Sequence, residues 1–192
     1  MITIGISGVA RSGKDHLGMI LCDYFQSLGL KARKFSFANE LKLDLDQFLI
    51  EKFGISAFTE NDIEKSIIRP MLIAYGQTKR KQSNGICWIQ KLKENIEKSD
   101  VDVAIITAVR FSDNEYDEPE FIRDTMNGTL IHLTRVNDDG LPVQPVCEDE
   151  ARNNPKIHQV ADLHLTWENI PIADARDQVR YFMDSTVDIW NR

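Results

Sequence analysis

The chain opens with a glycine-rich loop set between a short apolar run and an amphipathic segment. Residues 2–7 are mostly apolar and run into Gly8, which is typical of a buried strand. The loop reads Gly8-Val9-Ala10-Arg11-Ser12-Gly13-Lys14-Asp15. Apolar residues then recur at helical spacing from residue 17 to residue 28, and Gly29 ends the pattern. This order of strand, loop and helix predicts the first unit of an α/β fold.

The spacing Gly8-x4-Gly13-Lys14 is that of a phosphate-binding P-loop. Glycine permits backbone angles that turn successive N–H groups toward one centre, where they cradle phosphate oxygens. The helix that follows presents the positive end of its dipole to the same anion. Lys14 is expected to reach the β- and γ-phosphates. The sequence therefore predicts that residues 8–15 bind a nucleoside triphosphate, which we take to be ATP.

Asp15 stands where Ser or Thr usually follows the P-loop lysine and ligates Mg²⁺. A carboxylate is also a hard oxygen ligand that suits Mg²⁺, so Asp15 is the metal-ligand candidate. The alternative is that Asp15 satisfies free N–H groups at the start of the helix.

Short apolar strands alternate with longer helical stretches along the rest of the chain. Further strands are expected at 32–37, 101–107, 129–134 and 161–166, and helices at 39–52, 62–79, 86–98 and 173–190. This alternation predicts βαβ units and a parallel sheet covered on both faces. We expect a single three-layer α/β domain over residues 1–192, with five parallel strands.

Five details of this assignment are specific enough to check. The helix at 39–52 has Leu41, Leu45, Phe48 and Leu49 on one face, and the last helix is expected to turn Val187 and Trp190 inward. Pro70 should start, kink or split its helix. Residues 113–127 are predicted to be a polar helix or loop. Residues 136–155 carry three prolines and little periodicity, so a long surface loop is expected.

Composition narrows the function classes. A net charge of −7 argues against a nucleic-acid polymer or a membrane surface as partner, because polyanion binding needs a basic face. No signal peptide or membrane span is recognisable, and the three unpaired cysteines indicate a reducing cytoplasm. His16, His132, His158 and His164 show no HExxH or Cys/His spacing, so the sequence gives no support for a zinc site.

Several segments beyond the loop carry a resemblance through their order. They are Arg69–Gly76, Gln77–Arg80, Trp88, Val109–Glu115, Gly128–Arg135, Ala161-Asp162 and Glu168-Asn169. With them, the chain resembles the deoxynucleoside monophosphate kinases of bacteriophages along nearly its whole length. Its P-loop, with Asp after the lysine, is also similar to that of the animal phosphomevalonate kinases. Only the P-loop is individually specific.

The resemblance implies a P-loop kinase fold with an acceptor-binding helical segment at about 38–98 and a lid at about 136–158. It implies ATP and Mg²⁺ as cofactors, a deoxynucleoside monophosphate as acceptor, and the host cytoplasm as location. A homodimer is compatible with it. The implied catalytic residues are Lys14, Asp15, Arg69 and Arg110. ATP would be held by Gly8, Val9, Ala10, Arg11, Ser12, Gly13, Lys14, Asp15 and Arg135, and the acceptor by Arg69, Arg80, Trp88 and Arg110. Arginines suit these roles because phosphoryl transfer is mostly positioning and charge neutralisation.

One departure from the pattern concerns the metal. These kinases commonly end the third strand with Asp-x-Arg, whereas this chain has Ala108-Val109-Arg110. Asp15, or Asp113 and Glu115 just past the strand, would have to supply the missing charge. No catalytic role is assigned to the charged residues of the lid, which are Asp138, Asp139, Glu148, Asp149, Glu150, Arg152 and Lys156.

Three functions follow. The first is phosphorylation of a deoxynucleoside monophosphate to the diphosphate. The second is a kinase for another phosphorylated metabolite, such as phosphomevalonate. The third, prompted by Ala108, is nucleotide binding without phosphoryl transfer.

Overall fold

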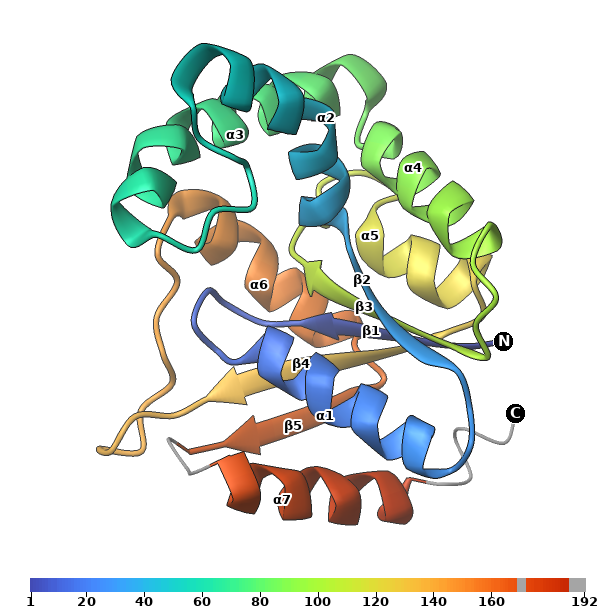
Figure 1. The fold of residues 1–192 in the computed structure, drawn as a ribbon. Helices are drawn as coiled ribbons and strands as arrows, with labels where there is room; N and C mark the ends of the chain where they lie inside the picture. The colour runs from blue at the N-terminus through green and yellow to red at the C-terminus, as the bar shows by residue number, and fades with distance from the viewer. Residues whose placement is uncertain (169–171, 187–192) are drawn as a thin grey trace.

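The computed structural model describes residues 1–168 and 172–186, whose strands form one five-stranded sheet in the order β2-β3-β1-β4-β5 (Figure 1). The strands are β1 (Ile2–Ser7), β2 (Ala32–Ser36), β3 (Val103–Val109), β4 (Thr129–Arg135) and β5 (Leu163–Trp167). Every pairing is parallel, so all carboxyl ends meet at one edge of the sheet. The predicted five-stranded parallel sheet is confirmed.

Helices cover both faces of this sheet, which confirms the three-layer α/β architecture (Figure 1). One face is covered by α1 (Lys14–Ser27) and α7 (Ile172–Ser185). The other is covered by α4 (Ile86–Glu97), by α6 (Glu148–Val160), and by the short α5 (Glu118–Glu120) with its π-helical continuation Phe121–Thr125. Helices α2 (Phe37–Phe53) and α3 (Asp62–Ser83) pack together beyond the β2 edge of the sheet.

The two-residue period of the strands divides the core into two halves. Ile4 and Ile6 of β1 pack with α1 and α7, whereas Ala104 and Ile106 of β3 pack with α4 on the opposite face. Val109 breaks the period, since an odd-numbered residue of β3 lies on the face of the even-numbered ones. The cause is Ala108, whose φ of 64° produces a bulge in the register of β3 against β1.

Helix α3 runs without interruption through Pro70, so the proline neither starts nor splits it. Ile68, on the turn before the proline, is fully buried against Leu49 of α2. At Gly76 the two helices approach so closely that a Cβ would lie 2.4 Å from a methyl carbon of Leu41. This packing outweighs the hydrogen bond that the proline cannot make.

The segment expected to be one long surface loop divides into two parts. Residues 136–147 are irregular, but Glu148–Val160 form helix α6 and bury Asn153 and Ile157. Three acidic residues begin this helix, where they complement its dipole, and Pro155 lies inside it. Asn169, Val187 and Trp190 lie outside the described residues.

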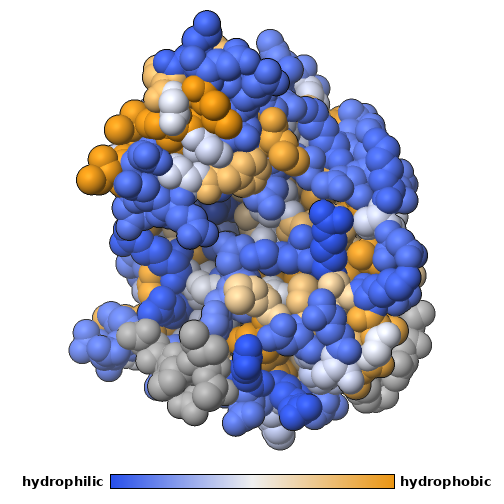
Figure 2. Space-filling view, viewed as in Figure 1, coloured by the Kyte–Doolittle hydropathy of each residue, from blue (hydrophilic) through white to orange (hydrophobic). Residues whose placement is uncertain are grey.

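Exposed apolar side chains gather on the α2–α3 pair, visible as the orange area of Figure 2. Ile63 and Ile67 are among them, and so is Phe48, which was expected to share a face with Leu41, Leu45 and Leu49 but is 43% exposed. Phe48 is exposed because α2 packs mainly through its Leu41, Leu45 and Leu49 side. No helix in the described part of the chain has the length and apolar character needed to cross a membrane.

Candidate phosphate-binding site

The loop at residues 8–13 is held in shape by the ends of two neighbouring strands. Gly8 has φ 137°, and a Cβ there would lie 2.4 Å from the carbonyl oxygen of Leu133 in β4. Gly13 has φ 93°, and its Cβ would lie 2.5 Å from the ring of Trp167 at the end of β5. The indole Nε1 of Trp167 also donates a hydrogen bond of 2.9 Å to the carbonyl oxygen of Ser12. Both glycines are therefore required by close contacts as well as by backbone angle.

Lys14 is buried and points back into its own loop. Its Nζ donates hydrogen bonds to the carbonyl oxygens of Gly8 and Val9, at 2.8 and 2.6 Å. Burial lowers the pKa of Lys14 to about 8, and the positive charge of Arg110 adds to this. The lysine thus lies inside the cradle that its motif predicts.

Glu150 of α6 places a carboxylate against the same loop. Both of its oxygens accept from the backbone N–H of Ala10 at 3.1 Å, and one also accepts from Val146 N at 3.2 Å. The side chain is buried, and its charge partly offsets the effects that lower the pKa of Lys14. The loop therefore receives an anion here, which is the behaviour expected of a phosphate cradle. Sequence reasoning missed Glu150, because nothing along the chain links it to Ala10.

Asp15 begins α1 next to the end of β3. Its Oδ1 accepts from the hydroxyl of Thr107 at 3.2 Å and from Lys34 Nζ at 3.1 Å. Burial acts to raise the pKa of Asp15, but the hydrogen bond and charge of Lys34, with help from Thr107, outweigh it and leave the pKa below its usual value. Lys34 reaches this point by packing its stem over Gly18, where a Cβ would lie 3.1 Å from Lys34 Cδ.

Ala108 occupies the position where the resemblance leads us to expect an aspartate. Its φ of 64° is a conformation that Asn and Asp adopt more readily than Ala. Thr107, directly before it, is the residue that hydrogen-bonds to Asp15. Of the two acids proposed as substitutes, Asp113 is bound by Arg152 at 3.1 Å and by Lys156 at 3.4 Å, while Glu115 is exposed. Asp15 and Thr107 thus place two oxygen atoms of the kind that Mg²⁺ prefers beside the loop.

Arg80 is engaged in a buried charge network. Its guanidinium binds both oxygens of Asp117 at 3.1 and 2.7 Å, lies 3.7 Å from Glu118, and stacks on the ring of Phe111 at 4.0 Å. Asp117 and Glu118 are almost entirely buried. An arginine with its fork occupied in this way holds the chain after β3 in place and has no free face for an acceptor phosphate.

Glu118 links that network to the end of β3. It accepts from the backbone N–H groups of Arg110 and Phe111 at 2.6 and 3.1 Å. Burial raises the pKa of Glu118 to about 7, against the opposing effect of these hydrogen bonds and of Arg80. Sequence reasoning missed Glu118, although its position in an acidic stretch just past a buried strand was a usable signal.

A cavity of about 790 Å³ connects the loop to α3. Arg11 contributes from the loop, and Lys65, Arg69 and Gln77 contribute from α3. Figure 2 shows the hollow below the apolar α2–α3 area. Asp62 also lines the cavity and pairs with Lys65 at 3.3 Å, so Arg11 and Arg69 are the lining cations that suit an anionic ligand. Trp88 is not among its lining residues: it is 4% exposed, packs in the core and donates to Gly76 O at 3.4 Å, so no base can stack on it here.

The two remaining predicted arginines lie at the carboxyl edge of the sheet. Arg110 follows β3, is exposed, and acts electrostatically on Lys14. Arg135, at the end of β4, donates to the carbonyl oxygen of Arg11 at 3.1 Å. The structure thus brings Lys14, Asp15, Arg110 and Arg135 together around the loop, puts Arg69 across the cavity, and leaves Arg80 and Trp88 in packed positions.

No protein-family model and no curated protein sequence matches this chain. Solved structures that resemble it include a shikimate kinase from Aquifex aeolicus vf5, with TM-score 0.47 and 16% identity over 97% of this chain and 98% of that one. A shikimate kinase from Acinetobacter baumannii in complex with shikimate gives TM-score 0.49 and 14% identity over 97% and 94%. A dephospho-CoA kinase from Campylobacter jejuni gives TM-score 0.47 and 14% identity over 99% and 98%. Similarities this weak assign no substrate, so function is argued from the site.

Proposed function

We propose that this chain is a phosphotransferase that moves the γ-phosphoryl group of ATP to a phosphorylated small molecule, with a deoxynucleoside monophosphate as acceptor. The observation that carries the proposal is that Arg11 of the loop lines the same cavity as Arg69 of α3. A donor phosphate on the loop and an acceptor phosphate on α3 would therefore meet in one hollow. The choice of a deoxynucleotide comes from the sequence resemblance alone.

In the proposed reaction, an oxygen of the acceptor phosphate forms a bond to the γ-phosphorus while the bond to the β,γ-bridging oxygen breaks. ADP leaves, and the acceptor becomes a diphosphate. The protein's part is to align the two oxygens and to neutralise charge, which is most of what phosphoryl transfer requires. Lys14 and Arg110 would act on the transferring group, Arg69 would bind the acceptor phosphate, and Arg135 would brace the loop through Arg11.

Asp15 and Thr107 would hold Mg²⁺, which would neutralise phosphate charge when bound. Their oxygens lie 3.2 Å apart beside the first turn of α1. Lys34 already neutralises Asp15, so a metal ion would have to compete with its ammonium group.

An acceptor panel tests the proposal. The protein would be incubated with ATP, Mg²⁺ and each deoxynucleoside and ribonucleoside monophosphate, with phosphomevalonate, and without acceptor, and ADP and the phosphorylated product would be measured. We expect a product with one deoxynucleotide and a raised KM in Arg69→Ala. Arg176→Ala, which removes an exposed helical arginine on α7, is the matched control. Turnover of a non-nucleotide acceptor alone would favour the second kind of kinase, and absence of ADP with every acceptor would refute transfer.

Nucleotide binding without transfer is the competing function, and Ala108 is the observation that favours it. In that case we expect ATP to bind and no acceptor of the panel to be phosphorylated. Lys14→Ala, with Lys31→Ala as control, separates the cases. A kinase loses about 10²–10³-fold in kcat, by analogy with removal of one transition-state donor. A binding protein loses ATP affinity and has no kcat to lose.

A further inference from the structure

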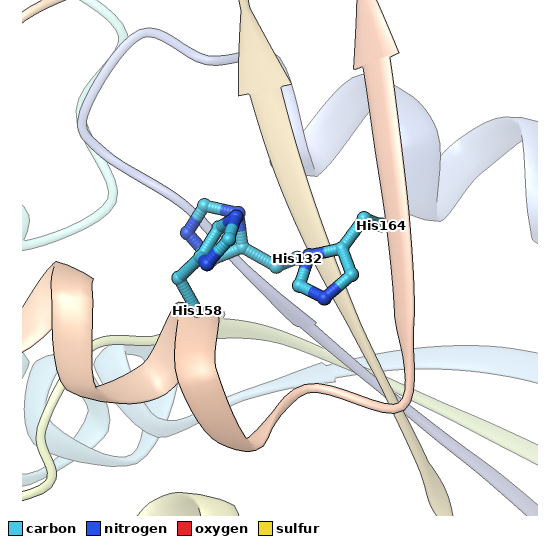
Figure 3. Close-up of side chains that lie close together, drawn as sticks. All are labelled: His132, His158 and His164. Atoms are coloured by element: carbon cyan, nitrogen blue, oxygen red, sulfur yellow. The ribbon is translucent and has the colours of Figure 1, made fainter.

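Three histidines from three different elements meet on the α6 face of the sheet. His132 and His164 are direct neighbours in the parallel register of β4 and β5, and His158 comes from the last turns of α6. The ring centroids of His132 and His158 are 4.7 Å apart, and those of His158 and His164 are 4.3 Å apart. Figure 3 shows the three rings gathered between the helix and the two strands.

His132 is the buried member of this histidine cluster. Its ring is 3% exposed, and its Nε2 lies 3.0 Å from Oδ1 of Asn154, one turn before His158 on α6. With Asn154 Oδ1 as acceptor, Nε2 carries the proton and Nδ1 carries the lone pair. This Nδ1 is buried and has no hydrogen-bond partner. A buried lone pair without a partner is costly in an ordinary core, so it points to a ligand.

The hydrogen bond from His132 Nε2 to Asn154 leaves the lone pair of Nδ1 directed away from that partner. A neutral imidazole with a lone pair on one nitrogen is the form that coordinates metals.

We propose that His132, His158 and His164 form a binding site for a divalent transition metal of the zinc class. One nitrogen from each ring lies within 4.8 Å of the other two. Tetrahedral Zn²⁺ with Zn–N bonds of about 2.0–2.1 Å needs ligand nitrogens about 3.3 Å apart. His158 and His164 are exposed, so small side-chain rotations can close that difference around the fixed His132.

The composition of the cluster selects the kind of metal. Three imidazoles suit Zn²⁺, Co²⁺, Ni²⁺ and Cu²⁺ and do not suit Mg²⁺ or Ca²⁺, which prefer oxygen. Three protein ligands leave the fourth position to water, and the two exposed rings give solvent access. Asn154 plays the part of an outer hydrogen-bond partner that fixes the tautomer of the buried ligand.

Such a site would tie α6 to the strands beneath it. Helix α6 also carries Glu150, whose carboxylate lies against the phosphate-binding loop. The metal would thus hold the helix whose other end reaches the loop. The inference does not depend on the proposed phosphotransferase activity.

A calorimetric titration of chelator-treated protein with Zn²⁺ alone tests the site. We expect one equivalent to bind, with affinity reduced at least about tenfold in His158→Ala and in His164→Ala. Both residues are exposed, so these variants should fold, which circular dichroism would verify. His16→Ala removes the one histidine outside the cluster and should bind Zn²⁺ as the parent does. Asn154→Ala should weaken binding by about 10–100-fold, the usual cost of losing an outer partner.

Replacing Zn²⁺ with Co²⁺ identifies the ligand atoms. Tetrahedral nitrogen ligation gives strong visible bands without the near-ultraviolet charge-transfer band of a thiolate. If the thiolate band appears and Cys147→Ser abolishes binding, the exposed Cys147 is the ligand and the proposal is wrong. Undiminished Zn²⁺ affinity in the double variant His158→Ala/His164→Ala would also overturn it. Absence of binding by the parent protein would mean that the three rings merely stack.

Discussion

The phosphate-binding loop and the chain that follows β3 lie at the same edge of the sheet but are built by different means. The loop uses consecutive residues, two of them glycines with positive φ, and it presents backbone N–H groups. The chain after β3 uses a bulge at Ala108 and a buried network that joins Arg80 of α3 to Asp117 and Glu118. The loop is therefore a local structure with a general affinity for anions. The chain after β3 depends on tertiary contacts, because Arg80 from α3 neutralises the charge of the buried acids there.

This difference affects how the two regions could take part in catalysis. Among the described residues, only the carboxylate of Glu150 is seen to compete with a phosphate for the backbone N–H of Ala10. Once Glu150 leaves this N–H, Lys14 and the loop are available to a phosphate. Arg80 is bound to the buried Asp117 and lies beside the buried Glu118, and releasing it would leave these acids hydrogen-bonded but without a cation. We therefore expect substitutions in the network of Arg80, Asp117 and Glu118 to act on stability and substitutions at the loop to act on nucleotide binding.

The largest effect is expected for Arg80→Met. It removes the cation bound to the buried carboxylate of Asp117, so the free energy of unfolding should fall by about 3–5 kcal/mol. Denaturant unfolding would measure this, with the exposed Lys81→Met as control. A raised acceptor KM at unchanged stability would instead restore Arg80 as an acceptor ligand.

Glu118 is expected to make the free energy of unfolding depend on pH by on the order of 3 kcal/mol. The reason is that burial raises its pKa from 4.5 to about 7 in the folded state. The folded state holds the proton up to pH about 7, whereas the unfolded chain releases it near 4.5. The contribution is therefore fully present below pH 4.5, declines between pH 4.5 and 7, and is absent above that. Glu118→Gln removes it while keeping an acceptor for the two N–H groups.

The measurement is the difference in unfolding free energy between the parent and Glu118→Gln as a function of pH. The parent should lose stability relative to the variant as pH rises through this range. Glu115→Gln, an exposed glutamate three residues earlier, should follow the parent throughout. A difference that is independent of pH would mean that Glu118 is ionised in both states.

A change of up to about tenfold, or about 1.4 kcal/mol, is expected in ATP affinity for Glu150→Gln. The substitution removes the negative charge that competes with phosphate at Ala10 N. Calorimetric titration with ATP would show a lower Kd, and Glu148→Gln, at an exposed acid in the same turn, should leave the Kd unchanged. If the Kd rises instead, Glu150 supports the loop rather than competing for it.

The smallest effect is expected for Ala108→Gly. A Cβ in the left-handed region costs roughly 1 kcal/mol, so removing it relieves strain in the folded state. Glycine also raises the conformational entropy of the unfolded chain, which offsets part of that stabilisation. A net stabilisation of less than about 1 kcal/mol should result. Ala74→Gly, inside helix α3, should destabilise by about 1 kcal/mol in the same assay. Destabilisation at both positions would show that the bulge is not strained.

The sequence by itself determined the elements whose causes are local. Apolar runs and glycines predicted β1, the loop and α1, and the alternation of strands and helices predicted the parallel sheet, because these signals depend on residues close together in the chain. The placement of Lys14, Asp15, Arg110 and Arg135 around the loop follows from the same logic, since the carboxyl ends of parallel strands share one edge.

Only the tertiary structure decided which distant side chains meet. The pairing of Glu150 with Ala10, the capture of Arg80 by Asp117, and the meeting of His132, His158 and His164 all join residues with no fixed spacing in the sequence. Helix α6 was expected to be loop because two of its stabilising causes exist only once the domain is assembled. They are the burial of Ile157 in the core and the hydrogen bonds of Asn153 to Ser112 and Asp113 after β3. Burial, strand register and helix packing created these contacts, and none of them leaves a periodic signal along the chain.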